Sequence, residues 1–197
     1  MKILVFSDLH GIPTDDEMCC IPPSDNYAFC VSLGDNPPKA ITKIQKYVNK
    51  PFYGIAGNHD TWETPKISGI SDIHGKVIQH NKLLFAGFGG SHRYKSGEFA
   101  MMTQAESIEA ADMLPHCDVL FSHDTMYGEL GAVSDNAHCG FKGISKYVEE
   151  NNIKVNICGH YHVNKSIVST NGCCKIICVC GCALMDTDDY DNIIQVF

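Results

Sequence analysis

The stretch Gly57-Asn58-His59-Asp60 decides how the rest of this sequence is interpreted. It follows an apolar run, residues 51–56, which predicts a buried strand that ends in a turn marked by glycine. An amide, an imidazole and a carboxylate in succession cannot all face a hydrophobic core. At the carboxyl end of a strand in an α/β sheet, such groups usually belong to a site.

Four further stretches repeat this arrangement of an apolar strand followed by Asp, Asn or His. They end in Ser7-Asp8-Leu9-His10, Gly34-Asp35-Asn36, Ser122-His123-Asp124 and Gly159-His160-Tyr161-His162. Carboxylate and imidazole groups together, with no thiolate required, are typical ligands of divalent metals. In Asp-x-His and His-x-His the polar residues are two apart, so in an extended chain both side chains point to one side. One strand end can therefore supply two ligands.

In this order, the five motifs resemble those of the calcineurin-like metallophosphoesterases, from residue 3 to about residue 162. Residues 89–94 and 138–141 further resemble a small, less studied phosphoesterase branch. The resemblance implies a single calcineurin-like phosphoesterase domain over residues 1–197. It also implies an α/β fold, a four-layer α/β/β/α sandwich of two mixed sheets flanked by helices.

The resemblance assigns metal ligands to the strand ends. Asp8, His10 and His162 would hold a first metal, Asn58, His123 and His160 a second, and Asp35 would bridge the two. A carboxylate between cations about 3.5–4 Å apart offsets their repulsion and leaves room for a bridging hydroxide that attacks phosphorus. Two divalent metal ions are therefore expected. Mn²⁺ is the favoured metal, and this ligand set also accepts Fe, Zn, Ni and Co.

His59 matches the family's catalytic histidine, and the resemblance implies that it stabilises charge on the leaving oxygen or protonates it. In the phosphatase branch a partner Asp lies three residues after the bridging Asp, but Pro38 stands at that position here. This difference favours a phosphodiester over a phosphomonoester. Arg93 and His138 are candidate substrate-binding residues, because Arg suits bidentate phosphate contact and His138 follows a long loop. Arg93 is equally typical of an exposed loop.

The remaining pattern predicts helices over residues 38–49, 101–114 and 140–151, the first burying Ile41, Ile44, Tyr47 and Val48. Asn81 and Asn171-Gly172 mark the turns of two predicted hairpins. Residues 61–75 are expected to be irregular, residues 91–99 to form a polar loop, and residues 192–197 to form the last strand.

Composition limits the classes of function. The 197 residues are 44% hydrophobic and 19% charged, ordinary values for one globular domain. A net charge of −8 argues against an extended nucleic-acid surface, because such surfaces depend on Lys and Arg. No apolar run approaches the roughly 20 residues of a membrane span, and the apolar start is too short for a secretion signal. We therefore expect a cytoplasmic protein that does not act at a membrane.

The 11 cysteines are an odd number, which argues against a disulfide framework and favours reduced thiols. Cys178, Cys180 and Cys182 alternate with other residues as in a strand, which favours buried thiols over a zinc or iron–sulfur site. Cys173-Cys174 invites the same two interpretations.

Together these patterns predict a dinuclear-metal-dependent phosphoesterase that hydrolyses a phosphodiester, or a small phosphomonoester. Two alternatives stay open. A nuclease acting on short or single-stranded ends would need a basic stripe, and no clustered one is visible. A catalytically silent metal-binding scaffold would be expected to have lost ligands or the catalytic histidine, and all of them are present.

Overall fold

The computed structural model describes residues 1–164, 166–172 and 174–197, and it contains two six-stranded mixed sheets. The first sheet has the spatial order β14 (Asp189–Gln195), β13 (Gly181–Asp186), β1 (Lys2–Ser7), β2 (Cys30–Ser32), β3 (Phe52–Gly54) and β4 (Ser71–Asp72). The second has the order β11 (Ile167–Thr170), β12 (Lys175–Cys178), β10 (Val155–Cys158), β9 (Val119–Ser122), β6 (Leu83–Phe88) and β5 (Val77–His80).

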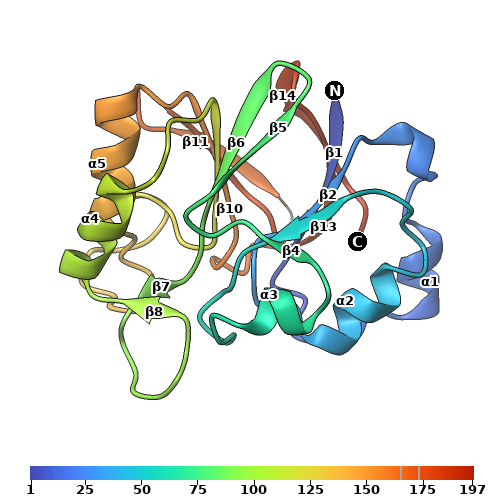
Figure 1. Ribbon diagram of the computed structural model, residues 1–197, viewed down its shortest axis with the longest axis horizontal. Coiled ribbons are helices and arrows are strands. Elements are labelled where there is room, and N and C mark those ends of the chain that lie inside the picture. The colour runs from blue at the N-terminus through green and yellow to red at the C-terminus, as the bar shows by residue number, and fades with distance from the viewer. Residues whose placement is uncertain (165, 173) are drawn as a thin grey trace.

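Helices cover the outer side of each sheet. Those beside the first sheet are α1 (Asp15–Cys19) and α2 (Pro38–Ile44), and those beside the second are α4 (Gln104–Asp112) and α5 (Lys142–Asn151). Figure 1 shows the two helix pairs on opposite flanks of the molecule with both sheets between them. The four-layer α/β/β/α sandwich predicted from the sequence is confirmed.

Aromatic rings fill the space between the two sheets. Phe29, which precedes β2, meets Phe85 of β6 with ring centroids 5.3 Å apart, and Phe85 stacks on Phe121 of β9 at the same distance. All three side chains are fully buried. Burial of such rings contributes about 1.5–3 kcal/mol each and fixes the two sheets relative to each other.

The parallel strands in the centre of each sheet bring their carboxyl ends to one edge. In the first sheet, β1, β2 and β3 run parallel. In the second, β6, β9, β10 and β12 run parallel. Residues that follow these strands in the sequence therefore meet at the same end of the sandwich.

The helix that starts at Pro38 is shorter than predicted. Residues 45–47 follow α2 as tight turns, because Lys46 and Tyr47 donate to the carbonyls three residues earlier. Tyr47 is 46% exposed, so the prediction that it lies on the buried face is wrong, whereas Ile41 and Ile44 are buried. In α5, by contrast, Ile144, Tyr147 and Val148 are buried, and the helix ends at Asn151, where Asn152 caps it in a left-handed conformation.

Other differences concern short elements. Residues 61–75 were expected to be irregular but contain α3 (Thr64–Ile67) and β4. Residues 101–114 hold β8 (Met101–Met102) before α4, because a capping box between Thr103 and Glu106 starts the helix at Gln104. The predicted loop 91–99 begins with β7 (Ser91–His92), which pairs with β8. The final strand begins at Asp189 and pairs with β13.

Both predicted hairpins are present, as the pairs β5–β6 and β11–β12. The prediction for Cys173 lies outside the described residues. Among the described residues, free thiols are found at Cys19, Cys20, Cys30, Cys117, Cys139, Cys158, Cys178, Cys180 and Cys182. No helix in the described part of the chain has the length and apolar character that crossing a lipid bilayer requires.

Candidate metal centre

The five strand ends singled out in the sequence converge on one place. Asp8 and His10 donate their backbone N–H groups to the carbonyls of Gly34 and Asp35, at 3.1 and 3.2 Å, which joins the ends of β1 and β2. The backbone N–H of His160 donates to Asp8 Oδ2 at 2.7 Å. This last contact crosses from one sheet to the other and closes the site.

Asp8, His10 and His162 form a first cluster. Asp8 Oδ1 lies 3.9 Å from His10 Nε2 and 3.6 Å from His162 Nε2, and these two ring nitrogens are 3.1 Å apart. Asp8 Oδ2 accepts hydrogen bonds from Ser7 Oγ and from the His160 backbone. Asp8 Oδ1 is buried and has no hydrogen-bond partner among the described residues. The three ligand atoms lie within 4.8 Å of one another, close enough to share one cation.

Asp8, Asp35 and His123 form a second cluster of the same size. Asp35 Oδ1 accepts the backbone N–H of His59 at 2.8 Å, while Asp35 Oδ2 is buried, 3.6 Å from His123 Nε2, and lacks a partner in the described chain. Burial alone would lower the pKa of His123, but the nearby carboxylates Asp35 and Asp8 raise it above its ordinary value. The cluster is therefore strongly negative and favours any positive charge.

Two contacts indicate where the ring of His123 carries its proton. Nδ1 lies 2.8 Å from the carbonyl of Leu33, which can only accept, so Nδ1 donates. Nε2 then presents a lone pair to Asn58 Oδ1, also 2.8 Å away. Two acceptor atoms at this distance repel each other unless a cation lies beside them or Nε2 is protonated. A metal that accepts both atoms as ligands removes the repulsion.

His160 is held with one ring nitrogen free. Its Nε2 donates to the carbonyl of Ala137 at 2.6 Å, and its Nδ1 is buried with no partner in residues that the structure describes. Burial lowers the pKa of His160 to about 3, so the ring is neutral at physiological pH. A neutral imidazole with a fixed tautomer and an unused nitrogen is typical of a metal ligand.

The backbone is strained at the same positions. Among the described residues, eight other than glycine have a positive φ, and five of these belong to the predicted ligand set: Asp8, His10, Asp35, His160 and His162. Such conformations cost about 1–3 kcal/mol each and persist at functional sites. Gly57 and Gly159 allow the close approach, because a Cβ on either would collide with a carboxylate oxygen, of Asp35 and of Asp8 respectively.

His59 lies beside the clusters and is exposed. Its ring meets His10 edge to face, with centroids 5.2 Å apart. Partial burial lowers the pKa of His59, the negative charge of Asp35 opposes this, and the positive charge of Lys95 adds to the lowering. No carboxylate of the described residues bonds to the His59 ring, which agrees with Pro38 at the expected partner position. The neighbouring Asp60 instead accepts the backbone N–H groups of Asp35 and Gly57.

The two predicted substrate-binding residues differ in their placement. His138 lies against the site, with its ring centroid 4.8 Å from that of His160 and its Nδ1 2.8 Å from Asp135 Oδ2. Arg93 is engaged elsewhere, because its Nη2 lies 3.1 Å from Glu106 Oε2 and donates to the carbonyl of Met101.

Sequence analysis missed Tyr94 and Tyr161. Tyr94 Oη accepts a hydrogen bond from Asn58 Nδ2 at 2.8 Å. Tyr161, between the two histidines of Gly-His-x-His, donates to Asp124 Oδ1 at 2.8 Å. The first pair is 36 positions apart in the sequence and the second 37. No spacing in the sequence signals either contact, because only the folded loops bring these residues together.

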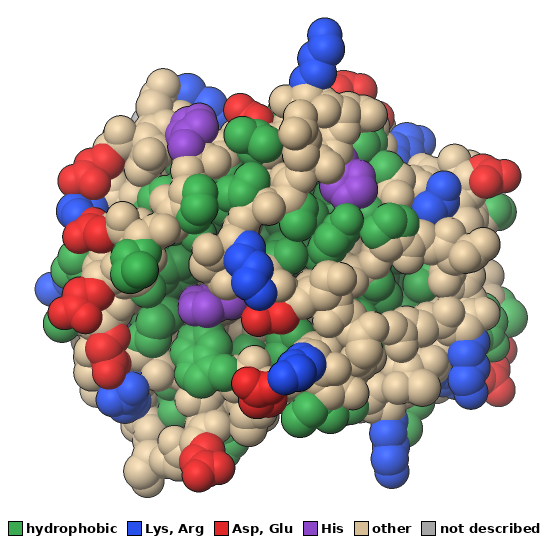
Figure 2. All heavy atoms as spheres, viewed as in Figure 1, with side chains coloured by type: hydrophobic (Ala, Val, Ile, Leu, Met, Phe, Trp, Pro, Cys, Tyr) green, Lys and Arg blue, Asp and Glu red, His purple; other side chains and the backbone are tan. Residues whose placement is uncertain are grey.

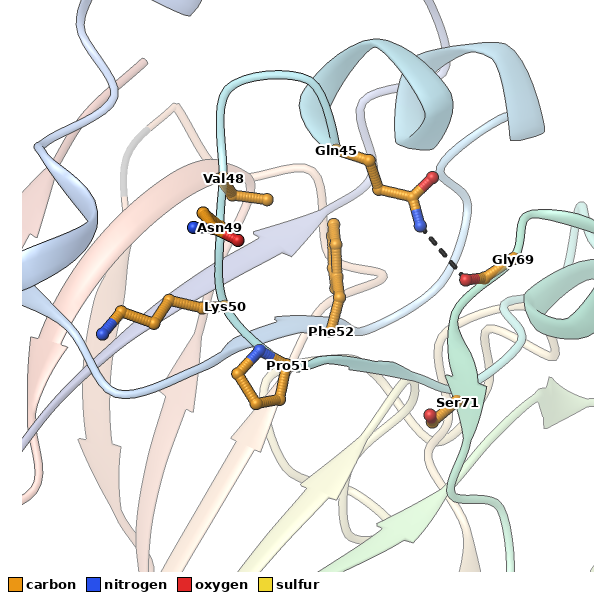
Figure 3. A pocket seen from close by; sticks show the side chains of 8 residues that line it. All are labelled: Gln45, Val48, Asn49, Lys50, Pro51, Phe52, Gly69 and Ser71. Atoms are coloured by element: carbon orange, nitrogen blue, oxygen red, sulfur yellow. Dashed lines mark hydrogen bonds between the residues drawn. The ribbon is translucent and has the colours of Figure 1, made fainter.

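Other features of the surface lie apart from this centre. A hollow of about 520 Å³ lies between the end of α2, β3 and β4. Figure 3 shows the side chains that line it and the hydrogen bond that Gln45 donates to the carbonyl of Gly69. Phe52 and Lys50 line it at the amino end of β3, the end opposite to the strand ends that carry the ligands. On the face drawn in Figure 2, Lys and Arg side chains are scattered rather than gathered in a stripe.

Solved structures of other proteins share the fold. The Thermus thermophilus protein TT1561 has a TM-score of 0.71 at 12% identity, covering 100% of this chain and 99% of that one. Phosphopantetheinyl hydrolase from Mycobacterium tuberculosis has a TM-score of 0.58 at 12% identity, covering 91% and 89%. A single mutant of Vps29 from Entamoeba histolytica has a TM-score of 0.51 at 12% identity, covering 94% and 86%.

Among curated proteins, none matches this sequence significantly. A family model described as calcineurin-like phosphoesterase matches residues 1–164, which include every strand end of the centre. Family membership supports a hydrolase of phosphoesters, and the clustered carboxylates and imidazoles support divalent metal binding. The chain belongs to the calcineurin-like phosphoesterase family.

Proposed function

We propose that this chain is a phosphodiesterase that uses two divalent metal ions. The observation that carries the proposal is a set of buried ligand atoms at the strand ends that have no partner among the described residues: Asp8 Oδ1, Asp35 Oδ2 and His160 Nδ1. Leaving a buried polar atom unpaired costs about 1–3 kcal/mol, and more for a charged group. Three such atoms around one place are best explained by cations that pair with them.

The residues present fit two metal ions. Asp8, His10 and His162 would hold one, Asn58, His123 and His160 the other, and Asp35 would contact both. When bound, the ions would polarise the phosphoryl oxygens and activate a water molecule for attack. Mn²⁺ is our first choice, because carboxylate, amide and imidazole ligands suit it, with Fe, Zn, Ni and Co as alternatives.

The chain itself supplies the remaining functions. His59 would stand at the leaving oxygen, where its lowered pKa keeps the ring neutral and able to donate a hydrogen bond. His138, fixed by Asp135, would line the substrate side next to His160. Arg93 would reach a substrate only after leaving Glu106, which leaves few cations for a phosphomonoester dianion and favours a diester.

A small substrate is compatible with the relatives in fold, one of which is named a phosphopantetheinyl hydrolase. The net charge of −8 does not favour an extended nucleic acid, and on the face drawn in Figure 2 the basic side chains are scattered. A protein-binding scaffold would not need the intact ligand set. We therefore treat the nuclease and the scaffold as alternatives that the following experiment separates from our proposal.

The test is hydrolysis of an aryl phosphodiester and the matching monoester by protein stripped of metal and then given each divalent cation in turn. We expect diester turnover that depends on added metal and falls about 100-fold or more in Asp35→Asn. Asp25→Asn, a change at an exposed carboxylate in the short helix at Ser24–Asn26, is the matched control and should keep full activity. Stoichiometric metal binding without any turnover would contradict the enzyme and favour the scaffold.

A further inference from the structure

One element of the site has no role so far: the loop of residues 93–99 between β7 and β8, called here the arm. Figure 1 shows it projecting from the lower edge of the molecule. Both of its ends are fastened to the turn that carries Asn58 and His59. Just before the arm, Gly90 donates its N–H to the carbonyl of Ala56 at 2.7 Å, and just after it, Ala100 donates to the carbonyl of Asp60 at 2.8 Å. The arm is thus fixed relative to His59.

Tyr94 continues this attachment into the site. Its hydroxyl accepts a hydrogen bond from Asn58 Nδ2 at 2.8 Å, so the arm touches a predicted metal ligand directly. The ring is 37% exposed and therefore forms part of the rim of the centre.

Lys95 is a charged residue of the arm that lies against two aromatic rings. Its ammonium lies 4.0 Å from the centroid of the Phe99 ring and 5.2 Å from that of Tyr94. The side chain is half-buried, and no carboxylate among the described residues pairs with it. Two aromatic faces hold a cation in place without neutralising it. A positioned cation that lacks a counter-ion is available to an anionic ligand.

The position of this charge relates it to the leaving group. His59 is the residue that would meet the leaving oxygen, and the arm is fastened to the residues on either side of it. The Tyr94 ring, 5.2 Å from the Lys95 ammonium, contacts Asn58, the residue next to His59, through its hydroxyl. Arg93, the basic residue expected from the sequence to bind the substrate, is already paired with Glu106.

We propose that Lys95 on this arm selects phosphoesters whose leaving group carries a second negative charge, such as a carboxylate or a further phosphate. The proposal rests on the proposed phosphodiesterase function, since it assigns the substrate class of the same site. The metal ions would bind the phosphoryl group under attack, and the Lys95 ammonium would attract the anionic part that departs.

The test compares two aryl methyl phosphodiesters whose leaving phenol carries a para carboxylate or the corresponding methyl ester. Lys95→Gln should lower kcat/KM for the carboxylate substrate about 3–10-fold, the range for one charge at a partly exposed site, and leave the methyl ester unchanged. Comparing each substrate between variants cancels their different intrinsic reactivities. Lys95→Arg should keep the preference, and added salt should weaken it.

Lys50→Gln is the matched control. Lys50 is also half-buried and without a carboxylate partner among the described residues, but it lines the hollow in Figure 3 at the opposite end of β3. This variant should behave as the unmodified protein on both substrates. Equal losses on both substrates in Lys95→Gln, or no loss on either, would overturn the proposed selection.

A binding measurement separates this inference from the proposed function. Non-hydrolysable phosphonate analogues of the two diesters are titrated into the metal-loaded protein by calorimetry. We expect Lys95→Gln to weaken binding of the carboxylate analogue alone, again about 3–10-fold. If the protein turns over neither diester but Lys95→Gln still weakens binding of the carboxylate analogue alone, the enzyme is refuted and the role of Lys95 is supported. Turnover without charge selection would refute the role of Lys95 alone.

Discussion

At the scale of single residues, the amide of Asn58 shows how a neighbour can decide which atom faces a metal. The oxygen and nitrogen of an Asn amide have the same shape but opposite hydrogen-bonding roles. Tyr94 accepts from Nδ2, which turns Oδ1 towards His123 and the second cluster. Only the oxygen can act as a ligand, so we propose that Tyr94 positions Asn58 for this side of the candidate centre.

Replacing Tyr94 by Phe should therefore weaken metal binding before it affects anything else. We expect about a 10-fold lower affinity for the metal that Asn58 would hold, because outer partners of ligands contribute 10–100-fold. Calorimetric titration of metal-free protein measures this without turnover. Tyr53→Phe, which removes a hydroxyl that contacts His80 away from the centre, is the control. Equal affinities in Tyr94→Phe and the unmodified protein would exclude the positioning role.

Sequence analysis singled out the proposed metal ligands because their residue types follow apolar strands. Parallel strands bring those ends together whatever the path of the intervening loops. Tyr94 and Lys95 escaped it for the opposite reason. Their contacts depend on the path of a loop, and no periodic pattern encodes that path. Arg93 was a reasonable candidate by residue type, but Glu106 on α4 lies within reach of its guanidinium only in the folded chain.

At the scale of elements, length decided what the sequence could predict. The strands of the two sheet centres and α5 carry clear apolar patterns, and they were found. With four residues in α3 and two in β4, neither element is long enough to show a periodic pattern of apolar residues. Residues 61–75 were therefore expected to be irregular. The strand β13 was not predicted, although its middle residues are buried. The final strand was expected to begin at residue 192 rather than at Asp189, because alternating exposure along β14 leaves only a weak apolar signal.

The connection between β4 and β5 depends on a neutral histidine. His74 Nδ1 accepts the backbone N–H of Gly89 at 2.9 Å, and burial lowers the pKa of His74 below its ordinary value of 6.5. The unfolded chain takes up a proton below pH 6.5 that the folded chain resists. Stability from this group is therefore complete above about pH 6.5 and falls as pH is lowered, by about 1.4 kcal/mol per unit of pKa difference.

His74→Asn should remove this part of the pH dependence, because its amide oxygen can accept from Gly89 but does not titrate. Urea unfolding of metal-free protein between pH 7.5 and 5 would measure the slope. We expect the free energy of unfolding to decline less steeply in the variant than in the unmodified protein. Parallel slopes would show that protonation of His74 is not linked to folding.

At the scale of the whole molecule, the sandwich concentrates negative charge at one edge. The side chains of Asp8 and Asp35 are fully buried there, one from each of two neighbouring strand ends, and each keeps an oxygen without a partner in the described chain. Buried charges without partners destabilise a fold. The protein without metal therefore carries a stability deficit that bound cations would relieve.

This deficit predicts a large thermal response to metal. Cations at 100 times their Kd add about 2.7 kcal/mol to the free energy of unfolding. For a domain of this size that corresponds to a rise in Tm of about 5–10 °C. Asp35→Asn removes one buried charge, so its metal-free form should melt above the unmodified protein, while its response to metal should be smaller. Scanning calorimetry of both proteins, with chelator and with Mn²⁺, tests the two effects together. If Mn²⁺ leaves the Tm of the unmodified protein unchanged, or if Asp35→Asn melts lower without metal, the unpaired carboxylates are stabilised by some other means and the centre does not depend on cations.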